Sequence, residues 1–220
     1  MTASRRFDLI AFDWDGTLFD STTLIVRCIQ AACRDLDLAV PSDSDAAYVI
    51  GLGLQDALRH AVPGLPSHRY PELGQRYRHH YFARQHELVL FPGTLEMLAE
   101  LKQRNHLLAV ATGKARRGLD EALAQAQLHA VFDATRTADQ TAGKPHPLML
   151  QELMAELDVT PERTLMIGDT THDLQLARNA GTARVAVSFG AHDTAAFAEH
   201  EPLFVAHSTR ELHDWLRQHA

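Results

Sequence analysis

The sequence has few of the features that mark secreted, membrane or nucleic-acid-binding proteins. Among 220 residues it contains two cysteines, Cys28 and Cys33, both in one stretch of helical pattern, so a disulfide framework is excluded. No apolar run approaches the roughly 18 residues of a membrane span. Lys and Arg number 21 against 28 Asp and Glu, a net charge of −7 that argues against a nucleic-acid partner. We therefore expect a soluble, cytoplasmic protein with neither a membrane nor a nucleic-acid partner.

The composition that remains is that of an ordinary globular domain, with 45% hydrophobic and 22% charged residues. Short apolar runs of buried-strand length alternate with helical patterns, which predicts an α/β fold with a Rossmann-like, doubly wound parallel sheet. The expected strands are Phe7–Phe12, Leu107–Ala111, Thr164–Gly168, Ala183–Val187 and Leu203–Val205. The expected helices are Thr94–Arg104, Arg116–Gln127, Pro147–Leu157, His172–Ala180 and Arg210–Gln218.

One long segment, residues 18–90, has no convincing strand signal. Helical patterns cover Ser21–Leu36, Leu54–Ala61 and His68–Leu88, and the prolines and polar residues between them, including Pro41–Ser44, indicate turns. An insertion of roughly 70 helical residues after the first strand of an α/β sheet is typical of a separate cap. We predict an α/β catalytic core of residues 1–17 and 91–220 and an all-helical cap domain of residues 18–90.

Two aspartates follow the first expected strand directly, in the motif Asp13-Trp14-Asp15-Gly16-Thr17. Ligands of open α/β sheets bind beyond the carboxyl ends of the strands. Two carboxylates at this position can divide the chemistry, one as nucleophile and one as acid and base. A calcium loop beginning at Asp13 would need Gly and Glu where Leu18 and Leu24 stand, so that alternative fails. A solvated turn with two idle aspartates stays open at this point.

Three further elements lie at or near strand ends. Thr112-Gly113-Lys114 offers a hydroxyl and a flexible backbone amide to a phosphate oxygen, and Lys144, between Gly143 and Pro145, could neutralise a phosphoryl group. Asp169 and Asp173 could bind a hard divalent cation through oxygen. Each has an ordinary alternative, namely a plain loop, a solvated lysine, and capping of a helix N-terminus.

Taken in order, these four elements resemble the haloacid dehalogenase superfamily in its phosphatase branch. The resemblance covers nearly the whole chain, and Phe91-Pro92-Gly93-Thr94 resembles the segment where that family returns from its cap to its core. The subgroup it resembles most is phosphoglycolate-phosphatase-like, with a helical cap inserted after the first motif. The resemblance implies that Asp13 attacks phosphorus and that Asp15 protonates the leaving oxygen and then activates water.

The same resemblance implies how phosphate and metal are held. Thr112 and the Gly113 amide would bind the phosphoryl oxygens, and Lys144 would neutralise charge on nucleophile and phosphate. Mg²⁺ would bind the Asp13 carboxylate, the Asp15 main-chain oxygen and Asp169, with Asp173 as a direct or outer ligand. His172, which follows the metal acids, is expected to be a solvated residue at a helix start, and the other histidines are expected on the surface.

The function that follows is an Mg²⁺-dependent phosphatase that hydrolyses a small phosphomonoester through an aspartyl-phosphate intermediate, with phosphoglycolate as one substrate to consider. A phosphosugar mutase of the same fold is the alternative enzyme, and cap contacts would distinguish the two. A catalytically silent binding or regulatory module is the alternative of another class. A 2-haloacid dehalogenase is disfavoured, because that branch does not use the second aspartate as a general acid.

Overall fold

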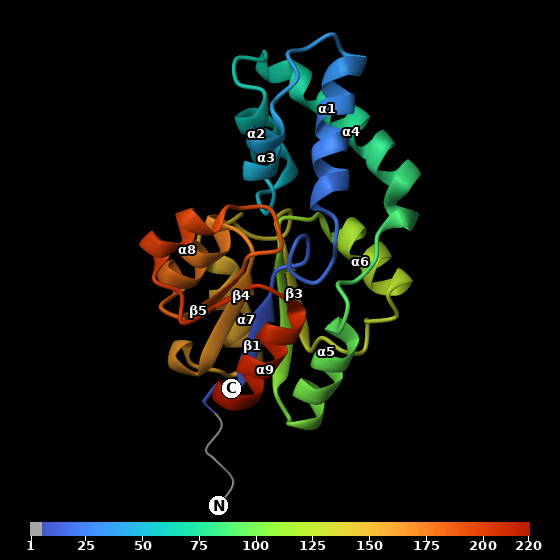
Figure 1. The fold of residues 1–220 in the computed structure, drawn as a ribbon. Helices are drawn as coiled ribbons and strands as arrows, with labels where there is room; N and C mark the ends of the chain where they lie inside the picture. Colours follow the sequence, from blue (N-terminus) through green and yellow to red (C-terminus); the bar gives the residue numbers. More distant parts are fainter. Residues whose placement is uncertain (1–5) are drawn as a thin grey trace, which may run out of the picture.

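The structure, a computed structural model, describes residues 6–220 and contains a six-stranded parallel sheet of order β3-β2-β1-β4-β5-β6 (Figure 1). The strands are β1 (Leu9–Phe12), β2 (Leu107–Thr112), β3 (Ala134–Thr137), β4 (Thr164–Gly168), β5 (Ala183–Val187) and β6 (Val205–Ala206). Strand β1 is central, with Leu9 in register with Leu107 of β2 and Thr164 of β4. Strands β2 and β3 lie on one side of β1, and β4, β5 and β6 lie on the other. The strand order therefore reverses beside β1, and open α/β sheets bind their ligands at such a point.

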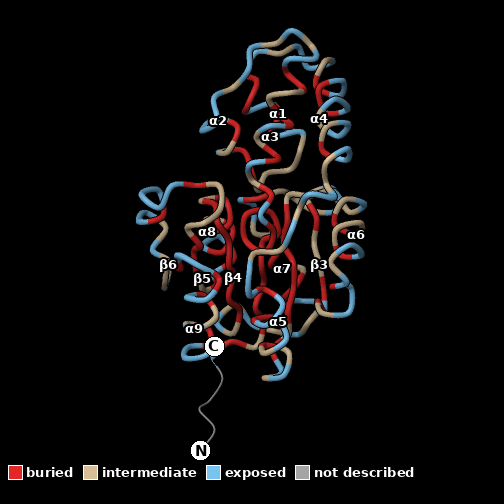
Figure 2. Tube along the Cα trace, turned by 45° about the vertical axis from the view of Figure 1, so that its right-hand side comes forward, coloured by how far each residue is buried: buried red, intermediate tan, exposed pale blue. Residues whose placement is uncertain are grey.

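Helices cover both faces of this sheet because successive residues of each strand point to opposite faces. Ile10 and Phe12 of β1 belong to the apolar cluster that includes helices α5 (Thr94–Gln103), α6 (Arg116–Gln125) and α9 (Thr209–His219). Leu9 and Ala11 belong to the cluster that includes α7 (Leu148–Leu157) and α8 (Thr171–Ala180). Burial is concentrated in the sheet and on the helix faces against it (Figure 2).

The segment between β1 and α5 is helical and lies beyond the carboxyl ends of the strands (Figure 1). Its elements are α1 (Thr22–Asp35), α2 (Asp43–Tyr48), α3 (Leu54–Ala61), a 3₁₀ turn at Ser67–Arg69, α4 (Tyr70–Arg84) and a second 3₁₀ turn at Gln85–Glu87. Residues of α1–α4 form an apolar cluster of their own that includes Ile29, Leu58 and Leu73. Within the described chain, extended pairing at this segment is confined to its ends, where Phe19 bridges to Leu90.

The expected fold class, a doubly wound parallel sheet with an inserted helical segment, is confirmed, and three elements needed correction. Strand β3 was not expected, because Ala134–Thr137 is short and contains Arg136, which pairs with Glu152 and Glu156 of α7 at the sheet edge. The segment from Pro41 that was read as a turn continues into α2, which Ser42 caps by accepting from the Asp45 N–H. Strand β6 begins at Val205, where Leu203–Val205 was expected.

Within residues 6–220 no helix combines the length and apolarity needed to cross a bilayer.

Candidate active site

Asp13 directly follows β1 and is buried, with only 1% of its surface exposed. Its Oδ1 accepts a hydrogen bond of 2.6 Å from the Lys144 ammonium, while Oδ2 is buried without a hydrogen-bond partner among the described residues. Burial raises the pKa of Asp13 well above its usual range; Asp173 and Asp169 add to the rise, and Lys144 opposes it. A buried carboxylate oxygen with no donor is costly. This oxygen is therefore positioned to receive a ligand.

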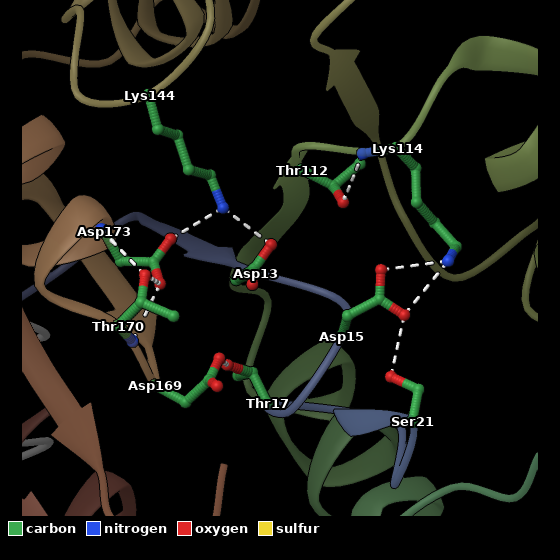
Figure 3. Close-up of polar contacts among 10 residues, drawn as sticks. All are labelled: Asp13, Asp15, Thr17, Ser21, Thr112, Lys114, Lys144, Asp169, Thr170 and Asp173. Atoms are coloured by element: carbon green, nitrogen blue, oxygen red, sulfur yellow. Dashed lines mark hydrogen bonds and ion pairs between the residues drawn. The ribbon is translucent and has the colours of Figure 1, made fainter. Parts of the chain in front are cut away.

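Lys144 lies between two carboxylates, and its side chain is fully buried (Figure 3). Its Nζ is 2.6 Å from Asp13 Oδ1 and 2.6 Å from Asp173 Oδ1. Burial alone would lower the pKa of Lys144, but Asp13 and Asp173 raise it above the usual range. The lysine is therefore an ammonium ion with a fixed position. The alternative of a solvated lysine is excluded.

Asp173 has a second, structural task at the start of α8. Its Oδ2 accepts from the Thr170 N–H at 3.1 Å and from the Thr170 hydroxyl at 2.6 Å, which forms a capping box with the N-cap residue. Helix capping was weighed against metal binding from the sequence. In the structure Asp173 caps α8 with one oxygen and binds Lys144 with the other.

Asp169 follows β4 and is completely buried. The Thr17 hydroxyl donates to its Oδ1 at 2.8 Å, and the Ala191 N–H donates to its Oδ2 at 2.7 Å. Burial, with Asp173 adding, raises the pKa of Asp169 from 3.8 to about 7. Gly16 and Gly190 enclose this carboxylate so closely that a Cβ at either position would collide with it. The chain therefore fixes the position of Asp169 at the carboxyl end of β4.

Asp13, Asp169 and Asp173 together form a potential metal site. They can each offer an oxygen such that all three lie within 4.8 Å of one another. All three are buried, and Asp13 Oδ2 has no donor in the described chain. Hard cations such as Mg²⁺ prefer carboxylate oxygen. The residues present therefore fit a divalent cation, and the Asp15 carboxylate lies outside this group.

The Asp15 side chain points away from Asp13, toward Lys114 and Ser21 (Figure 3). Lys114 Nζ donates to Oδ1 at 3.0 Å and to Oδ2 at 2.9 Å, and the Ser21 hydroxyl donates to Oδ1 at 2.7 Å. Lys114 also donates to the Tyr81 hydroxyl of α4 at 2.9 Å. Burial alone would lower the pKa of Lys114, but Asp15 and Tyr81 raise it above the usual range. The carboxylate is thus fixed by groups from both the sheet and the insertion.

Lys114, Ser21 and Tyr81 were not identified as site residues from the sequence. Lys114 had a signal, because it ends the Thr112-Gly113-Lys114 motif at the carboxyl end of β2. Ser21 and Tyr81 had none, since a serine before a helix and a tyrosine within one are common core and capping residues.

Thr112 and Gly113 lie where the inserted segment meets the sheet. Thr112 is buried at the end of β2, and its hydroxyl accepts from the Lys114 N–H at 3.2 Å. A Cβ on Gly113 would collide with the carbonyl oxygens of Gly51 and Leu52. The loop expected to bind phosphate is therefore covered by the loop between α2 and α3, and only glycine permits that approach.

A cavity of about 460 Å³ opens between this edge of the sheet and the inserted helices. Asp13, Asp15, Thr112 and Gly113 line it, whereas Lys144, Asp169 and Asp173 are not part of its lining. A larger hollow of about 630 Å³ lies between α6, β3 and α7, and no residue expected in the site lines it. Of the residues expected in the site, Asp13, Asp15, Thr112 and Gly113 therefore meet at the first cavity.

The expected exposure of the histidines was wrong for three of them: His106, His172 and His192 are buried. His172 Nε2 lies 2.8 Å and His192 Nε2 lies 2.9 Å from the Tyr48 carbonyl oxygen at the end of α2. His192 Nδ1 accepts from the Thr171 N–H at 3.1 Å, so its Nε2 is the donor. These two histidines join α2 to α8 and to the loop after β5, a contact that a solvated helix-start residue would not make.

Comparison with known proteins agrees with this geometry. The family model described as haloacid dehalogenase-like hydrolase matches residues 10–187. The chain belongs to this family. It is therefore a hydrolase, and the expected recognition, the enzyme class and the phosphatase-branch resemblance are confirmed.

Relatives and solved structures extend over nearly the full length of this haloacid dehalogenase-like hydrolase. A protein named probable phosphatase IndB, from Dickeya dadantii, is 35% identical, with 93% of this chain and 91% of the relative covered. Pyrophosphatase PpaX from Bacillus mycoides is 30% identical, with 94% and 95% covered. A crystal structure described as a predicted phosphoglycolate phosphatase from Haemophilus somnus has a TM-score of 0.87 and 25% identity, with 98% and 99% covered.

Proposed function

We propose that this hydrolase is an Mg²⁺-dependent phosphatase that cleaves a small phosphomonoester through an aspartyl-phosphate on Asp13. The observation that carries the proposal is the buried Asp13 carboxylate, with one oxygen 2.6 Å from Lys144 and the other without a donor in the described chain. The names of the relatives support phosphate chemistry. The expected partner is a phosphorylated metabolite of the cytoplasm.

The proposed reaction has two steps. An Asp13 oxygen attacks phosphorus, the bond from phosphorus to the leaving oxygen breaks, and Asp15 gives that oxygen a proton. Asp15 then takes a proton from water, the water oxygen attacks phosphorus, and the bond from phosphorus to Asp13 breaks. Bidentate contact with Lys114 and the bond from Ser21 hold Asp15 at the cavity wall.

Phosphoryl transfer is mostly positioning and charge stabilisation, and the remaining residues are proposed to supply both. Thr112 and the Gly113 amide hold phosphoryl oxygens, and Lys144 offsets negative charge on Asp13 and the phosphate. Asp13, the Asp15 main-chain oxygen and Asp169 would hold Mg²⁺, with Asp173 supporting the site. A bound Mg²⁺ would polarise the phosphoryl group and offset its charge.

We further propose that residues 18–90 act as a cap domain over a core of residues 1–17 and 91–220. The separate apolar cluster of α1–α4 supports this division. The contacts of the Gly51–Leu52 loop with Gly113 and of Tyr81 with Lys114 support a role in covering the site.

The test is release of nitrophenol and phosphate from 4-nitrophenyl phosphate, with Mg²⁺ and with a chelator. We expect turnover that the chelator abolishes and excess Mg²⁺ restores. Asp13→Asn should be inactive, because an amide cannot form the acyl phosphate. A chelator-insensitive enzyme, or an active Asp13→Asn variant, would contradict the proposal. Phosphate returned to an added phosphosugar, rather than to water, would indicate a mutase.

A further inference from the structure

The cavity beside Asp13 is larger than a phosphate group and a short leaving group require. Its volume of about 460 Å³ falls within the roughly 300–1,000 Å³ that is typical of small-molecule binding sites. Asp13, Thr112 and Gly113 form part of the wall, where the phosphate is proposed to bind. The remaining space faces the inserted helices and would receive the group attached to the phosphate.

The wall that faces this space is mostly apolar and comes from the insertion. Helix α1 contributes Ile25 and Ile29, the loop between α2 and α3 contributes Val49 and Ile50, and α3 contributes Leu54. The rings of Tyr77 and Tyr81 on α4 lie 5.9 Å apart, with planes inclined by 26°, and line the same cavity. Such a wall favours an apolar group that fills it and displaces water from it.

The cations of the cavity are poorly placed for a charged leaving group. Among the described residues, those that line it are Lys114, Arg78 and Arg117. Lys114 is already bound by both oxygens of Asp15 and by the Tyr81 hydroxyl. Arg78 is exposed, and the Arg117 side chain is 85% exposed and pairs with Glu121 at 2.9 Å. A carboxylate or second phosphate inside the cavity would contact apolar side chains and would lose its hydration at a high cost in free energy.

We infer that the substrate of this enzyme is a phosphomonoester of an uncharged, ring-sized apolar alcohol, and that phosphoglycolate and pyrophosphate are poor substrates. The inference rests on the proposed phosphatase function and narrows it. The apolar wall from α1, α3 and α4 binds the ring. The carboxylate of phosphoglycolate and the second phosphate of pyrophosphate would meet no buried, unpaired cation among the described residues that line the cavity.

Four substrates with the wild-type enzyme test the inference: benzyl phosphate, n-propyl phosphate, phosphoglycolate and inorganic pyrophosphate. Propyl phosphate and phosphoglycolate are matched in size and differ in charge, whereas benzyl and propyl phosphate differ in apolar bulk. We expect kcat/KM for benzyl phosphate to exceed that for propyl phosphate by about 10- to 100-fold. Propyl phosphate should in turn exceed phosphoglycolate by about 10-fold or more, because of the unpaired carboxylate.

A single substitution should then shift this order. Leu54 lines the cavity and is only partly buried, so Leu54→Lys adds a cation to the chamber wall at a position that the fold tolerates better than the cap interior. We expect it to lower kcat/KM for benzyl phosphate and raise it for phosphoglycolate, each by about 10-fold. Leu95→Lys is the matched control, because Leu95 of α5 is 52% exposed and does not line the cavity.

Each outcome of these experiments either supports or overturns the inference about the substrate. Phosphoglycolate or pyrophosphate cleaved as efficiently as benzyl phosphate would overturn the inference while leaving the phosphatase function intact. Leu54→Lys acting equally on both substrates, in a variant with a wild-type circular dichroism spectrum, would also overturn it. If Leu54→Lys does not fold, the wild-type series still decides. Absence of phosphate release from all four substrates would overturn the phosphatase function, and the inference with it.

Discussion

Asp13 and Asp15 are close neighbours in sequence, but their side chains meet different partners. Asp13 faces Lys144 and the buried acids, whereas Asp15 faces Lys114 and Ser21 (Figure 3). The separation fits two distinct chemical tasks, because an attacking carboxylate and a proton donor must reach opposite sides of the same phosphorus. It also allows each task to be removed separately.

Asp15→Asn should separate substrates by the stability of their leaving group. An alkoxide needs a proton as it leaves, so turnover of an alkyl phosphate should fall by roughly 10²–10⁴-fold. Nitrophenolate leaves without a proton, so the first step with 4-nitrophenyl phosphate should be largely spared. Rapid mixing should then show a burst of nitrophenol, and mass spectrometry of quenched protein should find phosphate on the Asp13 peptide. Equal losses on both substrates without a burst would exclude the assignment of Asp15.

Lys114→Met should slow catalysis without removing any group proposed to react. Asp15 would keep only its bond from Ser21, and loss of position of this kind can cost up to about 10²-fold in rate. We expect kcat for alkyl phosphates to fall while the first step with 4-nitrophenyl phosphate is largely spared, and Lys114→Arg to restore part of the rate. The control is Lys102→Met, which removes a partly exposed pair with Asp133; neither residue lines the cavity. Equal effects of the two Met variants would show that Lys114 has no positioning role.

At the scale of elements, the insertion and the core meet partly through backbone. The Gly51 and Leu52 carbonyl oxygens lie against Gly113, and the Tyr48 carbonyl oxygen lies within hydrogen-bond distance of His172 and His192. Backbone contacts of this kind depend on the path of the chain more than on side-chain identity. They leave little trace in the pattern of apolar and polar residues.

Gly113→Ala should impair turnover of every substrate while the protein stays folded. The added Cβ would collide with the loop between α2 and α3, so the insertion could not approach β2 as closely. We expect kcat/KM to fall by about 10²-fold on aryl and alkyl phosphates alike. Gly118→Ala is the control on the same cavity wall, since a Cβ there meets nothing within 4 Å and a helical alanine is favoured by up to about 1 kcal/mol. Gly113→Ala with wild-type kinetics would show that this contact does not matter for catalysis.

At the scale of the whole molecule, buried acids make stability depend on pH and metal. Burial, with Asp173 adding, raises the pKa of Asp169 from 3.8 to about 7. The folded chain then holds this proton at pH values where the unfolded chain has lost it. In the metal-free protein the contribution of Asp169 to stability should therefore fall as pH rises from about 3.8 to about 7, and level off above.

Thermal unfolding of metal-free wild type and Asp169→Asn, from pH 4 to pH 8, measures this contribution. The amide can donate to the Thr17 hydroxyl and accept from the Ala191 N–H, so the variant keeps the local contacts but has no proton to lose. We expect the Tm of wild type relative to the variant to decline with rising pH. Mg²⁺ should raise the wild-type Tm more at pH 8 than at pH 6, because cation and proton compete. A difference in Tm between wild type and Asp169→Asn that does not change with pH would contradict the raised pKa of Asp169.

The sequence by itself determined most of the sheet and the list of candidate site residues. The strands Thr164–Gly168 and Ala183–Val187 have the expected bounds, because a strand buried on both faces has a short, continuous apolar run as its sequence signal. The motif at Asp13 was readable for a similar reason, since its residues are adjacent in the chain. The edge strand β3 was not predicted from the sequence, because Arg136 interrupts its apolar pattern and pairs with residues of α7.

Only the tertiary structure decided which groups surround those residues. The pairs Lys114–Asp15 and Lys144–Asp13 join positions 99 and 131 residues apart, and Tyr81 reaches Lys114 from another element. His172 is buried because the end of α2 lies against it. Periodicity reports how one element meets solvent or core, and the identity of a partner depends on how distant elements pack. The apolar chamber likewise exists only once α1, α3 and α4 face the carboxyl edge of the sheet.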